Sequence, residues 1–169
     1  MPEAIRPYHL TADEGEATYF LGNLAVRKCG GRQSGGQLAV VEFVHPPGFA
    51  APLHRHTRED EAFYVIDGSI EGRCEGETFQ AGRGDFIWLP RGLAHTFIVG
   101  SDGARVLNLA TPAGFEDFVA EVGQPATSRS LPPSRTSPLW VTPRSCTASS
   151  CWARLHPRER GCPRGRGRD

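Results

Sequence analysis

Residues 48–61 of this chain read GFAAPLHRHTREDE, and they carry the first sign of chemistry. Alternate residues of a β-strand point to the same face, so His54 and His56 should project together, close enough to bind one metal ion. Glu61 opens the next apolar run, and a bend over residues 57–60 would bring its carboxylate to the same ion. A histidine on its own is more often an ordinary polar residue than a ligand. An H-x-H pair followed by a carboxylate and a strand indicates a metal site.

A second segment, residues 84–95, reads GDFIWLPRGLAH. In it a strand-like run ends in a turn formed by Pro90 and Gly92, and His95 begins the next run. Three of the six histidines are therefore expected at strand ends around one site. No role is assigned to the other three, which are His9, His45 and His156.

The pattern over residues 1–124 is typical of an all-β protein. Short apolar and β-favouring runs are separated by glycine, proline and aspartate turns, as in sandwiches and barrels. Strands are expected at residues 24–29, 37–44, 61–66, 69–74, 77–80, 85–89, 94–99 and 104–110.

Two connections can be predicted more closely. The dipeptide Asp67-Gly68 lies between two strand-like runs and favours a β-hairpin turn there. Apolar residues recur at helical spacing after the last run, which predicts one helix over residues 114–121.

Together the two segments resemble the two motifs of the cupin superfamily. The first motif, G-x5-H-x-H-x(3,4)-E-x6-G, is matched at every fixed position by Gly48, His54, His56, Glu61 and Gly68. The second, G-x5-P-x-G-x2-H-x3-N, is matched by Gly84, Pro90, Gly92 and His95, with Val99 where the family has asparagine. That asparagine does not bind metal in the family, so its replacement leaves the expected site intact.

The resemblance implies a single antiparallel jelly-roll β-barrel with a short C-terminal helix. It also implies a metal ion held inside by His54, His56, Glu61 and His95. Within the superfamily, residues 54–65 and 111–119 look most like single-domain relatives of quercetin 2,3-dioxygenase. Those enzymes cleave the central ring of a flavonol with O2 and release carbon monoxide, and their corresponding glutamate is credited with moving the substrate proton. Homodimers are a further expectation from similarity to other cupins.

Three imidazoles and one carboxylate would leave one or two coordination positions open, which suits iron, manganese, nickel or cobalt better than a closed structural zinc site. The pattern leaves zinc and copper open as well. An open position would let an enol or hydroxy-ketone bind as its anion. Glu61 is then the expected catalytic residue, acting both as a ligand and as the base that takes the substrate proton.

Strand alternation also predicts which residues contact the substrate. If Glu61 and His95 point inward, so do Phe63 and Phe97, which could pack on a flat aromatic molecule. The alternative is that both phenylalanines are ordinary barrel core. Tyr64 and Ile66 should face outward, where an apolar surface could pair two subunits.

The leading hypothesis is a metal-dependent dioxygenase that uses O2 on a small enolisable aromatic such as a flavonol. The same four ligands also serve isomerases, cyclases and decarboxylases that act on polyketide-like or sugar-like molecules, because a fold does not fix a function. A third hypothesis is that the chain is a non-catalytic module that binds a small molecule.

Residues 125–169 differ in composition from the barrel region. Residues 1–124 hold 10 basic and 17 acidic residues, whereas residues 125–169 hold 9 arginines, 2 acidic residues and 7 of the 14 prolines. Such a segment has too few apolar residues to form a core, so it is expected to be a disordered tail. Its composition resembles out-of-frame translation of GC-rich DNA, which suggests a frameshift near residues 132–135. Translating the neighbouring frames tests this, since neither should continue sensibly if the tail is genuine.

Several classes of function are disfavoured by the sequence. No apolar run approaches the ~20 residues of a membrane helix, and the first residues lack a secretory signal, so a cytoplasmic location is expected. Arg158–Arg168 could bind nucleic acid as a basic arm, but the frameshift hypothesis accounts for it better. The expected partners are a small-molecule substrate and O2.

Overall fold

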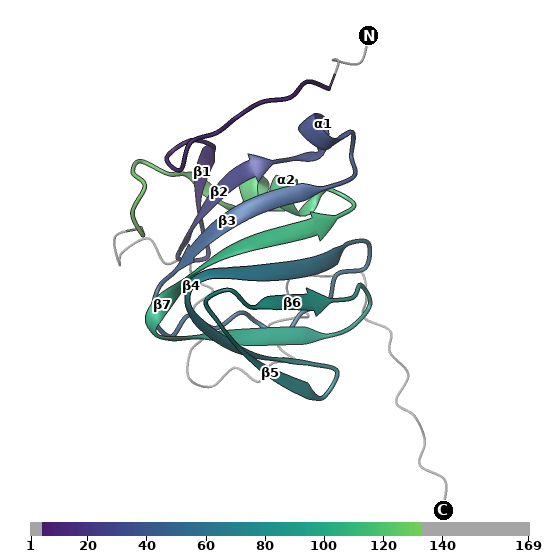
Figure 1. The fold of residues 1–169 in the computed structure, drawn as a ribbon, viewed down its shortest axis with the longest axis vertical. Coiled ribbons are helices and arrows are strands. Elements are labelled where there is room, and N and C mark those ends of the chain that lie inside the picture. The colour runs from purple at the N-terminus through teal and green to yellow at the C-terminus, as the bar shows by residue number, and fades with distance from the viewer. Residues whose placement is uncertain (1–4, 133–169) are drawn as a thin grey trace, which may run out of the picture.

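Antiparallel strands form most of the regular structure in the computed structural model, which describes residues 5–132 (Figure 1). The strands and helices are β1 (Glu16–Phe20), β2 (Asn23–Cys29), α1 (Gly31–Ser34), β3 (Ala39–His45), β4 (Asp60–Cys74), β5 (Glu77–Gly82), β6 (Phe86–Leu89), β7 (His95–Thr111), α2 (Phe115–Val122) and β8 (Gln124–Pro125). Within residues 5–132, no helix combines the length and apolar character needed to span a membrane.

The strands form two sheets that share β4 and β7. Hydrogen bonding follows the order β5-β4-β7-β3-β2-β1-β8, and β6 also pairs with β4. The first half of β4 pairs with the second half of β7, beside β3, whereas its second half pairs with the first half of β7, beside β5. On the other edge of that first half of β7 lies the segment before β4, joined by bridges from Ala50 to Ile98 and from His54 to His95. This arrangement confirms the jelly-roll cupin barrel.

β4 and β7 pass between the sheets by bending rather than by turning back. The predicted hairpin at Asp67-Gly68 is therefore wrong, because β4 runs through it with a register shift on either side. Gly68 has φ 76°, a left-handed conformation that also suits a β-bulge. A Cβ atom there would lie 2.1 Å from the carbonyl oxygen of Gly103 on β7, so the two backbones approach closely at this bend.

The barrel interior is filled by the inward-facing residues of both sheets. Phe43, Phe63, Val65, Phe97 and Val106 are among the buried hydrophobic residues that form one core cluster. The predicted helix over residues 114–121 is confirmed as α2, which packs against β1 and β3.

Two features at the chain ends were not foreseen. β1 was missed, because the segment Glu16–Phe20 has only a weak alternation of apolar and polar residues. The chain also stays in contact with this strand beyond residue 124, since β8 pairs with β1 and the Arg129 guanidinium donates to the Gly15 carbonyl. Most of the expected tail, with its basic run and the proposed frameshift junction from residue 133 onward, lies outside the described residues.

Replacing Gly68 with alanine should destabilise the barrel far more than replacing Gly76. Both glycines have a positive φ, 76° and 93°, but a Cβ at Gly76 meets nothing within 4 Å. Gly76→Ala should therefore cost only the backbone strain, about 1 kcal/mol, whereas Gly68→Ala adds a backbone collision and should cost about 3 kcal/mol or more. Urea unfolding measures both, and equal losses would contradict the close packing of the two bends.

Candidate metal centre

The four candidate ligands are brought together by the pairing of β4, β7 and the segment before β4. Backbone hydrogen bonds of 3.0 and 2.8 Å link His54 and His95 in both directions, so the two residues lie side by side. His56 follows two residues after His54, and Glu61 is the second residue of β4, opposite Ala110 of β7. The H-x-H pair, the start of β4 and the start of β7 therefore meet at one place, as the sequence predicts.

The donor atoms of these residues are close enough to share one cation. One ligand atom from each of His54, His56, Glu61 and His95 lies within 4.8 Å of the other three. His54 lies nearest to His95, with ring centroids 4.4 Å apart. Glu61 and His95 are almost fully buried, so the cluster lies inside the barrel.

Two of the imidazoles are held in one orientation by backbone carbonyls. The Nδ1 atom of His54 lies 2.7 Å from the Pro52 carbonyl oxygen, and Nδ1 of His95 lies 3.1 Å from that of Leu93. A carbonyl oxygen only accepts, so each Nδ1 carries the proton and donates it. The Nε2 atom of His54 is left with a lone pair for a metal ion, whereas Nε2 of His95 faces the Glu61 carboxylate and would give up any proton it shares there on binding one.

Glu61 is the most constrained member of the cluster. The amide of Asn108 donates to Oε1 of Glu61 at 2.6 Å, and Oε2 lies 3.0 Å from Nε2 of His95 and 3.6 Å from Nε2 of His56. Burial by itself would raise the pKa of Glu61, but the neighbouring His56 and His95 outweigh burial and hold that pKa well below its usual range. Glu61 is therefore a buried anion, which needs positive charge beside it.

The histidines differ in their surroundings. Burial and the neighbouring His95 lower the pKa of His54 to about 4, so this ring is neutral. Burial also opposes the charged form of His56, but the carboxylates of Glu61 and Glu59 outweigh burial and raise its pKa. Nε2 of His56 is buried and has no hydrogen-bond partner among the described residues.

These observations fit a bound cation. Three Nε2 atoms and one carboxylate oxygen form a donor set that transition metals accept, and a metal would satisfy the orphaned nitrogen of His56 and the buried charge of Glu61 together. The cluster could therefore hold a metal ion.

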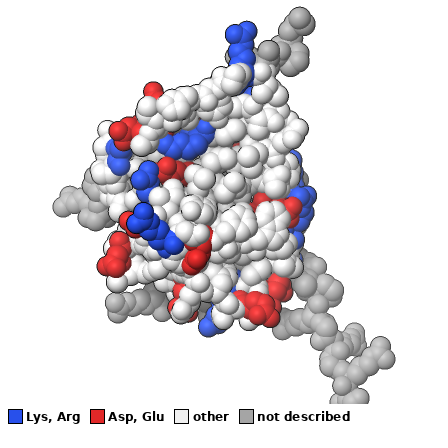
Figure 2. Space-filling view, in the orientation of Figure 1, with Lys and Arg blue, Asp and Glu red and all other residues white. Residues whose placement is uncertain are grey.

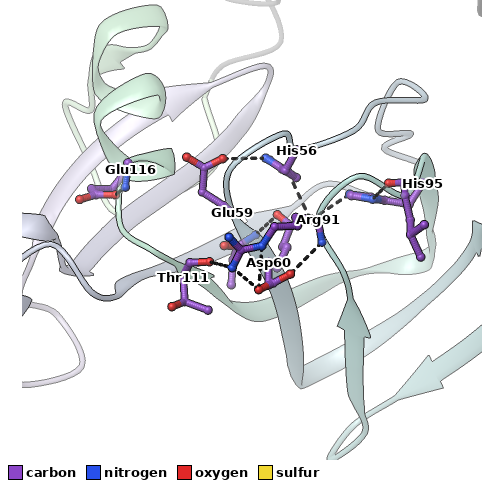
Figure 3. Close-up of polar contacts among 11 residues, drawn as sticks. His56, Glu59, Asp60, Arg91, His95, Thr111 and Glu116 are labelled. Atoms are coloured by element: carbon purple, nitrogen blue, oxygen red, sulfur yellow. Dashed lines mark hydrogen bonds and ion pairs between the residues drawn. The ribbon is translucent and has the colours of Figure 1, made fainter.

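A clamp beside the cluster was not foreseen. The Arg91 side chain donates to Asp60 Oδ2 at 2.5 and 3.1 Å, and the Arg91 backbone N–H donates to Oδ1 at 2.8 Å (Figure 3). Arg91 thereby lowers the pKa of Asp60 to about 2. The clamp joins the turn before β7 to the start of β4, next to Glu61.

The phenylalanines nominated from strand alternation do face the interior. Phe63 and Phe97 are both buried, and their ring centroids lie 5.3 Å apart in an edge-to-face arrangement. Of the histidines given no role, His9 is exposed, His45 is buried in the core, and His156 lies outside the described residues.

Asn108 is the site residue that sequence reasoning missed. The motif places an asparagine four residues after the last histidine, where this chain has Val99, and the motif does not extend to Asn108. The sequence does carry one signal for Asn108, which is a polar residue in an otherwise apolar strand. In the structure this side chain points inward, since Asn108 is 3% exposed and lies opposite Phe63.

Comparison with known proteins supports the fold. The family model described as a cupin domain matches residues 41–110. Quercetin 2,3-dioxygenase from Bacillus subtilis is 28% identical over 133 residues, which cover 79% of this chain and 40% of that protein. The chain thus spans less than half the length of this relative.

Solved structures of other cupins have a similar fold. An RmlC-like cupin from Shewanella frigidimarina has a TM-score of 0.55 at 20% identity, covering 69% of this chain and all of that one, and this likeness concerns the fold. A variant of the Bacillus subtilis oxalate decarboxylase has a TM-score of 0.52 at 26% identity, covering 66% of this chain and 33% of that one. The barrel and its motifs place this chain in the cupin superfamily. Its sequence is similar to quercetin 2,3-dioxygenases.

Replacing Asn108 with alanine should weaken metal binding about tenfold or more, because Glu61 loses the donor that orients its carboxylate. His95→Ala, which removes a ligand outright, should lower metal occupancy at least as far. Elemental analysis after dialysis against a competing chelator measures both. The exposed His9→Ala variant is the control, and metal retention equal to that control in both variants would show that the cluster does not hold the ion.

Proposed function

We propose that this chain is a metal-dependent cupin dioxygenase that uses O2 on a small enolisable aromatic of the flavonol type. The observation that carries the proposal is the cluster of three imidazoles around a buried glutamate. The similarity to quercetin 2,3-dioxygenase supports the choice of reaction, although this chain covers 40% of that enzyme.

The proposal assigns the metal to His54, His56, Glu61 and His95. Iron, manganese, nickel or cobalt suits such a donor set with an open position, and zinc or copper could also occupy it. A bound divalent ion would supply positive charge that lowers the pKa of a coordinated hydroxyl group and stabilises the resulting anion.

Glu61 is the proposed catalytic residue. Its carboxylate is charged at neutral pH and is held from one side by Asn108, so one oxygen stays fixed while the other faces the histidines. A substrate hydroxyl that meets Oε2 can pass its proton to this oxygen. Asn108 acts as a positioning residue, since it sets the direction of the carboxylate.

Phe63 and Phe97 are the proposed substrate-binding residues. Each lies two positions from a ligand on the same face of its strand, and their rings are in contact. Edge and face contacts of this kind favour a flat aromatic molecule over an aliphatic one.

The alternative function is a decarboxylase, isomerase or cyclase with the same metal ligands. The likeness to oxalate decarboxylase at 26% identity favours the decarboxylase among these. O2 would be consumed with the substrate by a dioxygenase but not by an isomerase, and a decarboxylase would release carbon dioxide.

Oxygen uptake distinguishes these functions. Metal-loaded protein supplied with quercetin in air should consume O2 and release carbon monoxide in equal amounts, and Glu61→Gln should lower the rate about 100-fold, in the range expected for loss of a positioned proton acceptor. His9→Ala should leave the rate unchanged. If quercetin is stable in air while oxalate releases carbon dioxide, the alternative is correct. If neither reacts but quercetin raises the melting temperature, the chain is a binding module.

We propose further that two copies pair through the outer face of β4, β6 and β7. This outer-sheet patch consists of Tyr64, Phe86, Trp88, Leu107 and Leu109. Tyr64, Phe86 and Trp88 are 44%, 60% and 51% exposed, which is high for aromatic side chains at adjacent positions. Figure 2 shows few charged side chains over the middle of this face and both signs of charge at its margins, which suits a self-complementary contact.

Trp88→Asp should convert a dimer into a monomer, because the interface would then bury an unpaired charge. The matched control is Ile98→Asp, which alters a side chain 57% exposed on the part of β7 paired with the other half of β4. Sedimentation velocity measures both. A monomeric parent chain, or a Trp88→Asp variant that remains dimeric, would contradict the proposed interface.

A further inference from the structure

The side-chain amide of Asn108 has a hydrogen-bond partner at only one of its two ends. Its nitrogen donates to Oε1 of Glu61 at 2.6 Å. Its oxygen, Oδ1, is buried and has no hydrogen-bond partner among the residues that the structure describes. Within residues 5–132, the one other buried side-chain atom in this state is Nε2 of His56, a candidate metal ligand. A buried acceptor without a donor is unfavourable, so Oδ1 needs a partner as Nε2 does.

The orientation of this amide is set by Glu61. Turning the amide over would bring its oxygen against a carboxylate oxygen, so that two acceptors would face each other. Nδ2 therefore faces Glu61, and Oδ1 is the atom left without a partner. Because the oxygen and nitrogen of a carboxamide are about 2.3 Å apart, Oδ1 lies within about 5 Å of Oε1 of Glu61. The unpartnered acceptor is thus next to the metal cluster.

The side chains around Asn108 do not supply the missing donor. Asn108 lies opposite Val41 of β3 and Phe63 of β4, and both of these side chains are apolar and buried. The Nδ1 protons of His54 and His95 are already donated to backbone carbonyls. A donor for Oδ1 is therefore expected from a molecule bound at the cluster.

We infer that Oδ1 of Asn108 accepts a hydrogen bond from a substrate hydroxyl group that lies next to the metal-binding oxygens of the substrate. The inference rests on the proposed function and narrows its substrate class to flavonols that are hydroxylated beside the ketone. Phe63, a proposed substrate contact, lies directly across from Asn108, so one molecule can contact both residues. Oxalate carries no proton at neutral pH and would leave Oδ1 unpaired, so Asn108 favours the dioxygenase over the decarboxylase.

Quercetin and fisetin test the inference, because fisetin differs from quercetin only in lacking the hydroxyl group beside the ketone. Both are titrated under nitrogen into protein loaded with zinc, which has no redox chemistry, and fluorescence gives the two dissociation constants. The preference of the wild-type protein for quercetin over fisetin should fall about fivefold in Asn108→Leu, the effect of losing one hydrogen bond between neutral groups. Leucine is similar in size to asparagine and has no acceptor.

Two further variants separate the two ends of the amide. Asn108→Leu also removes the donor to Glu61, but a weakened metal site affects both flavonols alike and leaves the ratio of their dissociation constants unchanged. Asn108→Asp is the matched control: an aspartate keeps an accepting oxygen whether or not it is protonated, so the preference for quercetin should be retained. Asn108→Ala also lacks the acceptor and serves if the leucine variant does not fold. Zinc content is measured before each titration.

The outcomes separate this inference from the proposed function. An unchanged preference in the leucine and alanine variants would overturn the inference and indicate a water molecule as the partner of Oδ1, even if quercetin is consumed with O2. A preference lost equally in Asn108→Asp would also overturn it, because the amide would then act only through Glu61. A preference that depends on the acceptor, without any O2 consumption by protein loaded with a redox-active metal, would support the contact and refute the dioxygenase. Failure of the wild-type protein to bind either flavonol would overturn both.

Discussion

The buried carboxylate of Glu61 is the constraint on which the rest of the site depends. A charged group that is 2% exposed would be very costly without compensation, and the protein surrounds it with one amide donor and three imidazoles. The amide fixes one oxygen, while the histidines can share the other with a cation. The backbone carbonyls of Pro52 and Leu93 complete the arrangement, because they set the protons of His54 and His95 on the nitrogens that face away from the cluster.

The two long strands supply the geometry that this charge requires. Glu61 lies near the start of β4, and Asn108 and His95 lie on opposite halves of β7. These positions converge because both strands bend at the contact between Gly68 and Gly103, so that β7 contributes to both sheets. The Arg91–Asp60 clamp then fixes the turn before His95 against the residue that precedes Glu61. The close approach of Gly68 to Gly103 therefore helps to position the site residues on β4 and β7, although neither glycine belongs to the site.

Sequence reasoning recovered the barrel, helix α2 and the four clustered residues, because each depends on short-range patterns. The H-x-H pair and the turn before His95 are readable as spacings, and strand alternation correctly turned Phe63 and Phe97 inward. The failures concern features that only pairing across the sheet decides. The dipeptide Asp67-Gly68 is compatible with either a hairpin turn or a β-bulge. Pairing with β7 on both sides of it keeps β4 continuous, and a bulge forms. Asn108 and His45 could not be assigned, since their partners are 47 and 22 residues away in sequence.

The most direct test of the central claim is an anomalous-difference map from a crystal of metal-loaded protein, recorded at the absorption edge of the bound metal. The account predicts one strong peak at about 2.0–2.3 Å from Nε2 of His54, His56 and His95 and from one carboxylate oxygen of Glu61. A map with no peak among these four side chains, or with its strongest peak elsewhere, would contradict it.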